Sequence, residues 1–484
     1  MRQPNKIYAG PGGVMRGCGR ASRQRKKKHG SVVRSVSLSH QHQCVRLLRF
    51  LHQRGLTPTL LRPAVFSGTH TRTFNSVVHT CHVCASLVSP DTGRGLQAVR
   101  NVKPGQLLIS LPQSCLLTTS TVMDSYLGQY IKSWKTRPSP LLVLCVFLVC
   151  ERHRGEYSDW FPYMDILPAT YSCPAYFSDD VMALLPSGVQ RRALEQREAV
   201  RELHSSNQDL FQTLQPLLSH PAADVLTYEA LRWAWCSVNT RSVFMPQPSN
   251  EFLHGQDVYA LAPFLDFLNH QPDVQVKAGF NPSTKCYEIR SVCGTQRFQQ
   301  AFINYGSHDN QRLLLEYGFV APGNPHSVVY VDTETLRQVL RGDRSLEQKM
   351  KFLREKNFHN NLTISSEGPS WRLMTTLRLM SLPQTQYHQW GAVLRGQAVD
   401  EEADLWSVRT AMTLCERLLL NTLRALHQIS RLLQQGEELK EQLQVVESLR
   451  VEEKCILGSC LESLRQSLGD ASVSSNQRDT NYAS

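Results

Sequence analysis

The sharpest break in the hydrophobic pattern lies at residues 261–270, which read LAPFLDFLNH. The bulky apolar side chains of this stretch predict a buried core segment. Asn269 and His270 follow them directly, without a surface-like spacer. An amide and an imidazole at the end of a buried run need hydrogen-bond partners, because unpaired buried polar groups are costly. This transition therefore marks a candidate functional site.

A second stretch of the same character is residues 301–320, AFINYGSHDNQRLLLEYGFV. Tyr305 ends a short apolar run and precedes a glycine, and Tyr317 precedes Gly318 and Phe319. Each hydroxyl follows an apolar segment, and each glycine lets backbone or ligand approach closely. Any one of these residues alone is compatible with ordinary core whose polar atoms are satisfied. Their combination favours a site.

Residues 93–96 read GRGL and precede a predicted β-hairpin. Its strands are expected at 96–99 and 102–111, with Lys-Pro-Gly at 103–105 as the turn between them. Glycines at the mouth of such a hairpin allow backbone amides and carbonyls to meet a ligand.

Most of the remaining chain has helical periodicity. Helices are expected at 45–56, 141–149, 180–217, 228–238, 336–353, 371–382 and 405–468. The apolar run at 140–150 is too short to span a bilayer and predicts a buried helix instead. The region 116–226 is thus an α-helical segment between two β-rich ones.

The net charge of +12 belongs to one end of the chain. Residues 1–90 hold 15 Lys and Arg and no acid, so the remainder carries 12 − 15 = −3. This split disfavours nucleic-acid binding by the whole protein and leaves the leader as the basic part. The 14 cysteines have no framework spacing, which favours free thiols in a reducing compartment.

Residues 1–44 are expected to form a disordered basic leader, and 469–484 a disordered tail. The cluster RQRKKK at 23–28 is typical of nuclear import, although a solvated charge run has similar standing. An Arg- and Ser-rich leader also fits a mitochondrial transit peptide, which consecutive lysines suit less well. Nucleus and cytoplasm are the expected locations.

Residues 67–90 contain a single Cys-x-x-Cys pair with flanking histidines, namely His79, Cys81, His82 and Cys84. Structural zinc sites usually need a second pair at set spacing, and none follows. The segment is therefore interpreted as an anomalous inserted loop or a gene-model artefact, and no metal is predicted.

Five motifs together resemble the SET-domain protein-lysine methyltransferases, in the branch of the plant Rubisco large-subunit methyltransferase. They lie at 93–96, 239–244, 266–270, 305–306 and 317–319. The resemblance covers residues 45–468, with two departures: Gln271 replaces a common serine, and 67–90 interrupts the chain before the glycine motif.

The resemblance implies an α+β fold with a split SET domain, built of small β-sheets and a pseudoknot-like C-terminal part. The expected segments are 45–115 and 227–322 for the SET domain, 116–226 for a helical insertion, and 323–468 for an all-α substrate-binding domain.

The resemblance also implies S-adenosylmethionine as the cofactor and a lysine of a protein substrate, such as a histone tail, as the acceptor. Tyr305 and Tyr317 are the implied catalytic residues. The implied cofactor-binding residues are Arg94, Gly95, Thr240, Arg241, Asp266, Asn269, His270, Tyr305, Tyr317 and Phe319. For Arg241, a structural ion pair is an equally good interpretation.

Tyrosines suit this chemistry. A lysine with a pKa of ~10.4 is protonated in water, whereas methyl transfer needs its neutral amine in a dry, narrow passage. A tyrosine ring can form the wall of that passage and its hydroxyl can orient the amine. Two alternatives stay open: a non-catalytic SET-like module that binds peptides, and a helical scaffold with a nucleic-acid-binding arm. No membrane association is expected.

Overall fold

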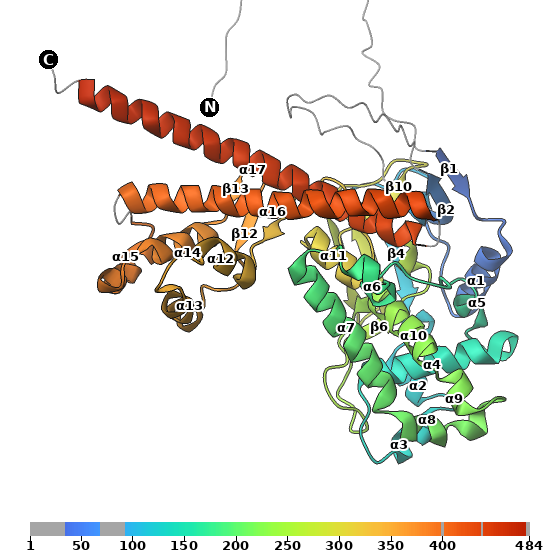
Figure 1. Cartoon of the computed structure of the whole chain (residues 1–484). Helices are drawn as coiled ribbons and strands as arrows, with labels where there is room; N and C mark the ends of the chain where they lie inside the picture. Colours follow the sequence, from blue (N-terminus) through green and yellow to red (C-terminus); the bar gives the residue numbers. More distant parts are fainter. Residues whose placement is uncertain (1–33, 68–91, 398–400, 437–438, 481–484) are drawn as a thin grey trace, which may run out of the picture.

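The computed structural model in Figure 1 describes residues 34–67, 92–397, 401–436 and 439–480. The basic cluster at 23–28 and residues 68–90 of the predicted insertion lie outside these ranges. The predicted disorder of residues 1–44 is wrong for its last part, since β1 (Arg34–Ser37) is a strand and α1 (His42–Gln53) already begins. The reason is non-local: β1 is held by antiparallel pairing with β2 (Leu61–Ser67).

The largest sheet has five strands in the order β1-β2-β3-β10-β7. Its further members are β3 (Gly93–Ala98), β10 (Gln300–Ile303) and β7 (Asn269–His270). β2 and β3 pair antiparallel with Phe66 opposite Gly93, so the segments on either side of the insertion are neighbours. β10 and β7 pair in parallel, with Ile303 opposite His270. This parallel pair brings the two stretches singled out in the sequence side by side.

The predicted hairpin at 96–111 is wrong, because its two strands belong to different sheets. β4 (Leu107–Pro112) pairs with β9 (Cys286–Ser291), which pairs with β8 (Val276–Asn281). Near the turn, the Val102 N–H donates to the Thr295 carbonyl at 2.8 Å, and the reverse bond measures 3.0 Å. A local turn signal does not specify the partner strand, and here the partner comes from much later in the chain. A two-stranded ribbon is formed by β5 (Ser242–Phe244) and β6 (Tyr259–Leu261).

The predicted helical insertion consists of two long helices, the buried α4 and the partly exposed α7, and several short ones. Its elements are α2 (Thr119–Met123), α3 (Gly128–Ser133), α4 (Pro140–Arg154), α5 (Phe161–Met164), α6 (Asp179–Met182), α7 (Ser187–Ser205), α8 (Gln208–Thr213) and α9 (Ala222–Val225). The Ser139 hydroxyl accepts from the Leu142 N–H, and Pro140 occupies the first turn of α4, which fixes where this helix begins. α4 packs against α10 (Tyr228–Arg241) in the core that it shares with the large sheet.

The C-terminal region is helical, as predicted, and forms a second core. Its helices are α12 (Thr333–Leu340), α13 (Leu346–Glu355), α14 (Trp371–Ser381), α15 (Trp390–Leu394), α16 (Glu401–Gln435) and α17 (Lys440–Thr480). α16 and α17 lie side by side along much of their length (Figure 1). None of the helices in the described ranges is long and apolar enough to cross a membrane.

Two details of this region differ from the expectation. It is not entirely α-helical, because β11 (Val329–Tyr330), β12 (Thr363–Ser365) and β13 (Gly368–Pro369) form a small antiparallel sheet. The predicted disordered tail is also wrong up to Thr480, since α17 continues that far. A single glycine at 469 costs a helix only about 1 kcal/mol and does not end it.

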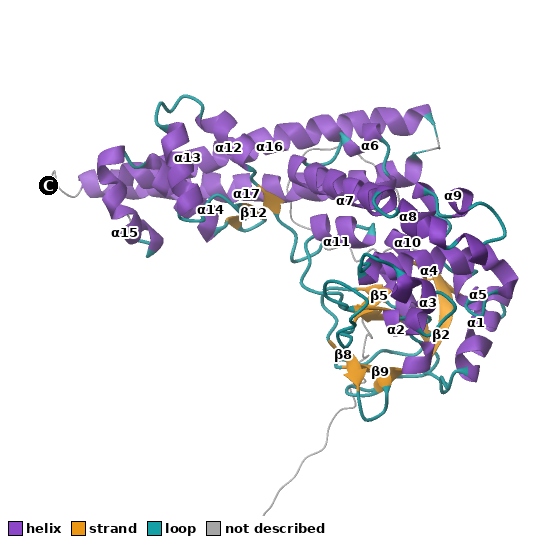
Figure 2. Ribbon diagram, turned by 90° about the horizontal axis from the view of Figure 1, so that it is seen from below, coloured by secondary structure: helices purple, strands orange, loops and turns teal. Residues whose placement is uncertain are grey.

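A third core joins the insertion to the C-terminal helices through α11 (Asn310–Tyr317). It combines Phe177, Val181 and Leu185 with Leu314 and Leu315 of α11, Ile429 of α16, and Leu443 and Val446 of α17. The buried Arg450 guanidinium adds a hydrogen bond to the Leu184 carbonyl at 2.9 Å. Figure 2 shows most strands gathered on one side, with the C-terminal helices extending away.

Candidate active site

A strained backbone conformation at Phe264 precedes the polar pair Asn269 and His270, which ends the buried run. Phe264 is fully buried and has φ of 74°, a left-handed conformation that is costly for an aromatic residue. A short 3₁₀ turn at Leu265–Phe267 follows and leads into β7. The core thus holds Asn269 and His270 in one orientation beside β10.

Asn269 ties this turn to the glycine motif. Its side-chain amide donates to the Arg94 carbonyl at 2.9 Å and approaches the Thr92 carbonyl at 3.4 Å. A Cβ built on Gly95 would lie 3.0 Å from Asn269 Nδ2 and 2.4 Å from Gln300 Nε2. A side chain at this position would require the Gln300 and Asn269 amides to shift, so Gly95 lets both amides approach the strand closely.

His270 presents a buried N–H. Its Nδ1 accepts a hydrogen bond from the Tyr305 backbone N–H at 3.1 Å, which places the proton of the neutral ring on Nε2. Burial, together with the nearby His308 and His326, lowers the pKa of His270 to about 4, so the ring is neutral at pH 7. Nε2 is buried and has no hydrogen-bond partner in the part of the chain that the structure describes.

Three aromatic rings, those of Tyr305, Tyr317 and Phe319, gather next to this histidine. The Tyr305 ring centroid lies 4.8 Å from that of Tyr317, 5.2 Å from that of His270 and 6.2 Å from that of Phe319. The Tyr305 hydroxyl donates to the Leu268 carbonyl at 2.8 Å. Burial raises the pKa of Tyr305, so the hydroxyl stays protonated.

Gly318 allows the chain to turn between Tyr317 and Phe319. It ends α11 in the left-handed conformation, with φ of 77°. A Cβ at this position would lie 2.9 Å from the backbone nitrogen of Cys173. The helical insertion therefore approaches the site here and restricts this position to glycine.

A buried ion pair lies beside the ring cluster. Arg241, the last residue of α10, contacts the Asp266 carboxylate at 3.2 Å, and that carboxylate is only 1% exposed. The Tyr163 hydroxyl donates to the same oxygen at 3.1 Å. Burial raises the pKa of Asp266, and the Arg241 charge opposes this shift. Arg241 therefore forms the structural ion pair that the sequence analysis gave as its alternative role.

Two of the predicted cofactor residues have side chains engaged elsewhere. The Thr240 hydroxyl donates to the Cys236 carbonyl of its own helix at 2.8 Å. The Arg94 guanidinium donates to the Ile166 carbonyl at 2.9 Å and lies 5.8 Å from the centre of the Phe267 ring. Arg94 therefore meets the site through its backbone carbonyl, which accepts from Asn269.

Three residues of the site were missed by the sequence analysis. Tyr163 comes from the helical insertion, and Gln300 lies against Gly95. His308 stacks on Tyr317 with ring centroids 6.2 Å apart. No local pattern marks Tyr163 or Gln300, whereas His308 lies within the tyrosine-glycine stretch and could have been included.

The unpaired buried polar atoms of the site suit a polar ligand such as S-adenosylmethionine, which carries a carboxylate, an ammonium and an adenine. Within the described ranges, four buried atoms of the site have no hydrogen-bond partner: His270 Nε2, Asp266 Oδ1, Arg241 Nε and Gln300 Nε2. They comprise both donors and an acceptor, next to a glycine that admits close approach. The residues present therefore fit this cofactor. No group of three or more His, Cys, Asp or Glu that could hold a metal occurs in the described segments.

The fold is similar to that of solved structures of Rubisco LSMT. The crystal structure of the SET domain of LSMT bound to lysine and AdoHcy superposes with a TM-score of 0.56 at 18% identity, covering 88% of this chain and 91% of that one. The structure of Rubisco LSMT bound to AdoMet gives a TM-score of 0.54, covering 88% and 92%.

Sequence comparisons give closer relationships. The family described as Rubisco LSMT substrate-binding matches residues 341–457. Actin-histidine N-methyltransferase of Drosophila melanogaster is 29% identical over 259 residues, covering 50% of this chain and 47% of that protein. SET domain-containing protein 4 of Homo sapiens is 42% identical over 455 residues, covering 93% of this chain and 98% of that protein. The chain belongs to the SET domain-containing protein 4 family.

Proposed function

We propose that this protein is an S-adenosylmethionine-dependent methyltransferase that modifies a lysine side chain of a protein substrate. The observation that carries the proposal is the contact between the Tyr305–Tyr317 ring cluster and the turn at Asn269 and His270, which the Gly95 strand adjoins. Relatives named as actin-histidine methyltransferases support protein methylation. The similar fold of LSMT, solved with lysine and AdoHcy, supports lysine as the acceptor.

Each part of the site has a role in this proposal. The bound cofactor supplies the methyl group. Asn269 fixes the glycine strand, and the His270 Nε2–H offers a buried donor to the cofactor. The rings of Tyr305 and Tyr317 wall the passage, where exclusion of water lowers the pKa of the entering amine. The Tyr305 oxygen, which donates its proton to the Leu268 carbonyl, keeps lone pairs that can orient the amine. In-line placement of two reactants can lower a barrier by ~7–11 kcal/mol.

The decisive experiment incubates the purified protein with labelled S-adenosylmethionine and a cell lysate, followed by mass spectrometry of the labelled residues. Labelled lysine supports the proposal, whereas labelled histidine would show that the methyl acceptor is histidine instead of lysine. Calorimetric titration with the cofactor tests the alternative of a non-catalytic peptide-binding module, which need not bind it. The substrate, histone or non-histone, would be identified by the same labelling.

The first prediction concerns Asn269. Asn269→Ala removes the link to the Arg94 carbonyl and should weaken cofactor binding about tenfold, since an unpaired buried group costs ~1–3 kcal/mol. Calorimetry measures the cofactor Kd. Asn281→Ala is the matched control, because that amide contacts Glu288 in the β8–β9 ribbon instead. Unchanged cofactor affinity in a folded Asn269→Ala protein would show that Asn269 does not hold the cofactor.

The second prediction concerns location, which we propose to be both nucleus and cytoplasm. It rests on the basic cluster at 23–28 of the sequence. Replacing residues 25–28 with alanine should shift a fluorescent fusion of the full chain towards the cytoplasm, as fractionation or imaging would show. An unaltered distribution, or cleavage and mitochondrial import of the leader, would contradict nuclear import.

A further inference from the structure

The imidazole of His308 lies against the tyrosines that wall the proposed passage. Its ring stacks on that of Tyr317, with centroids 6.2 Å apart and an angle of 25° between the ring planes. A Cβ built on Gly306, the residue that follows Tyr305, would lie 2.6 Å from His308 Nε2. The ring therefore adjoins one tyrosine directly and the other through its backbone, and the mechanism proposed above does not use it.

The backbone of His308 is fixed, while its side chain reaches the surface. Its N–H donates to the Gly306 carbonyl at 2.8 Å, and its own carbonyl accepts from the Asn324 side-chain amide at 2.8 Å. Asn324 is only 5% exposed, so this contact belongs to the core. The His308 side chain is partly exposed, and the preceding Ser307 is exposed. The imidazole is thus held beside the passage with access to water.

Methyl transfer to an amine needs a proton acceptor, because a lysine side chain is protonated in water. The other titratable groups of the site are poorly suited to this task. Burial raises the pKa of Tyr305 and of Tyr317, so both phenols keep their protons. His270 Nδ1 already accepts the Tyr305 N–H, and the Asp266 carboxylate is held in a buried ion pair. His308 is the remaining base of this group of residues.

Charged or titratable groups face His308 from its own loop, from α11 and from β7, namely Asp309, Arg312, Glu316, Tyr317 and His270. Burial is the largest cause of the lowered pKa of His308, the Arg312 charge adds to it, and the two carboxylates oppose it. Both carboxylates have other partners: Glu316 pairs with Arg312 at 2.8 Å, and Asp309 accepts from the Tyr330 hydroxyl at 2.6 Å. The His308 ring is therefore neutral at pH 7 and able to accept a proton.

We propose that His308 removes the proton from the substrate ammonium and passes it to water. This inference rests on the proposed function. The ammonium gives one proton to the imidazole, which leaves a neutral amine and an imidazolium. The amine lone pair then forms the bond to the methyl carbon as the carbon–sulfur bond breaks, and that bonding pair stays on sulfur. The imidazolium finally releases its proton to solvent.

The dry passage makes this proton transfer feasible. In water the pKa values of lysine and histidine differ by about four pH units, so the ammonium would keep its proton. Full burial can lower the pKa of an amine by up to about 3–5 units, which removes most of this difference. The rings of Tyr305 and Tyr317 supply that burial next to the base.

The first test is the pH dependence of methyl transfer from labelled cofactor to lysate protein. The wild-type rate should fall as the pH drops below the usual histidine value of about 6.5, because an imidazolium cannot accept a proton. His308→Gln should lose this dependence and be slower at pH 7 by a factor of about 10². Near pH 9 the difference should narrow, since more amine is neutral in solution. His308→Phe keeps a ring on Tyr317 and should show the same loss.

The matched control is His153→Gln. His153 is also partly exposed and burial lowers its pKa, but its ring contacts His220 within the helical insertion. This variant should keep both the rate and its pH dependence. A His308→Phe protein as active as the wild type would show that the ring only packs, and an unchanged pH profile in His308→Gln would likewise refute the proton role alone. A wild type that labels no residue would refute the proposed function and this role with it.

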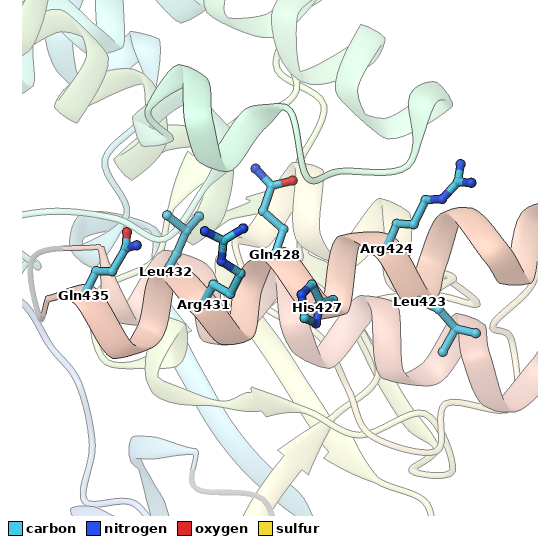
Figure 3. A pocket seen from close by; sticks show the side chains of 7 residues that line it. All are labelled: Leu423, Arg424, His427, Gln428, Arg431, Leu432 and Gln435. Carbon is cyan, nitrogen blue, oxygen red and sulfur yellow. The ribbon is translucent and has the colours of Figure 1, made fainter.

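A second readout does not depend on methyl transfer. In the full chain labelled at its histidine rings, NMR should show His308 titrating with a midpoint below about pH 6.5 in the absence of substrate. Its signal is identified by its loss in His308→Gln. His427, on the open face of α16 (Figure 3), gives an exposed reference in the same spectra. A His308 ring that does not titrate would overturn the proposal.

Discussion

Replacing Tyr305 with phenylalanine should lower turnover by a factor of about 10² or more while cofactor affinity persists, as expected when an interaction specific to the transition state is lost. The ring and its contacts with Tyr317 and His270 remain, so only the hydroxyl disappears. The remaining cost is the hydrogen bond to the Leu268 carbonyl, about 1 kcal/mol of unfolding free energy.

Turnover, cofactor Kd and melting temperature should be measured on the same Tyr305→Phe preparation. Tyr126→Phe is the matched control, because its hydroxyl bonds to Glu151 at 2.5 Å within the helical insertion. We expect that control to lose stability but to keep its turnover per folded molecule. If Tyr305→Phe behaves like Tyr126→Phe, the Tyr305 hydroxyl only satisfies a core hydrogen bond and is not catalytic.

Replacing Asp266 with alanine should destabilise the protein by about 3–5 kcal/mol, the usual cost of leaving one partner of a buried ion pair uncompensated. The Asp266 carboxylate is 1% exposed and contacts Arg241 at 3.2 Å, while Tyr163 donates to the same oxygen. Chemical denaturation monitored by circular dichroism measures the loss. The size of this effect follows from the low polarity around the Arg241 charge.

Two comparisons make the Asp266 prediction specific. Glu316→Ala breaks an exposed pair with Arg312, whose side chain is 53% exposed, and should cost no more than about 1 kcal/mol. The double variant Arg241→Ala with Asp266→Ala should be less destabilised than Asp266→Ala alone, because no charge is then buried unpaired. If the double variant is instead as unstable as the sum of the two single variants, the pair is not coupled as described.

Cofactor binding can be separated from stability in the same variants. Saturating cofactor should raise the melting temperature of the wild type by mass action. Asp266 Oδ1 and Arg241 Nε are both buried without partners in the described ranges. If either atom contacts the cofactor, Asp266→Asn should reduce that increase. Such a result would give Arg241 and Asp266 a binding role in addition to their ion pair.

Local sequence predicted where the candidate site lies along the chain. The apolar run before Asn269 predicted burial, and the glycines at 95 and 318 marked close approaches that the structure contains. The long helical periods predicted most of the insertion and the C-terminal helices, since side-chain burial along a helix repeats with the helix itself. These features depend on neighbouring residues, which is why the sequence alone was sufficient.

Only the tertiary structure decided which segments meet. The parallel pairing of β7 with β10 sets Tyr305 on His270, and the insertion contributes Tyr163 to Asp266. Pairing between distant segments also placed β4 beside β9 rather than β3. It likewise made a strand of β1, whose four residues have no strong strand pattern. Such pairings are chosen by the burial and hydrogen bonding of the whole core, because a strand's own pattern fixes which face is apolar but leaves its partner open.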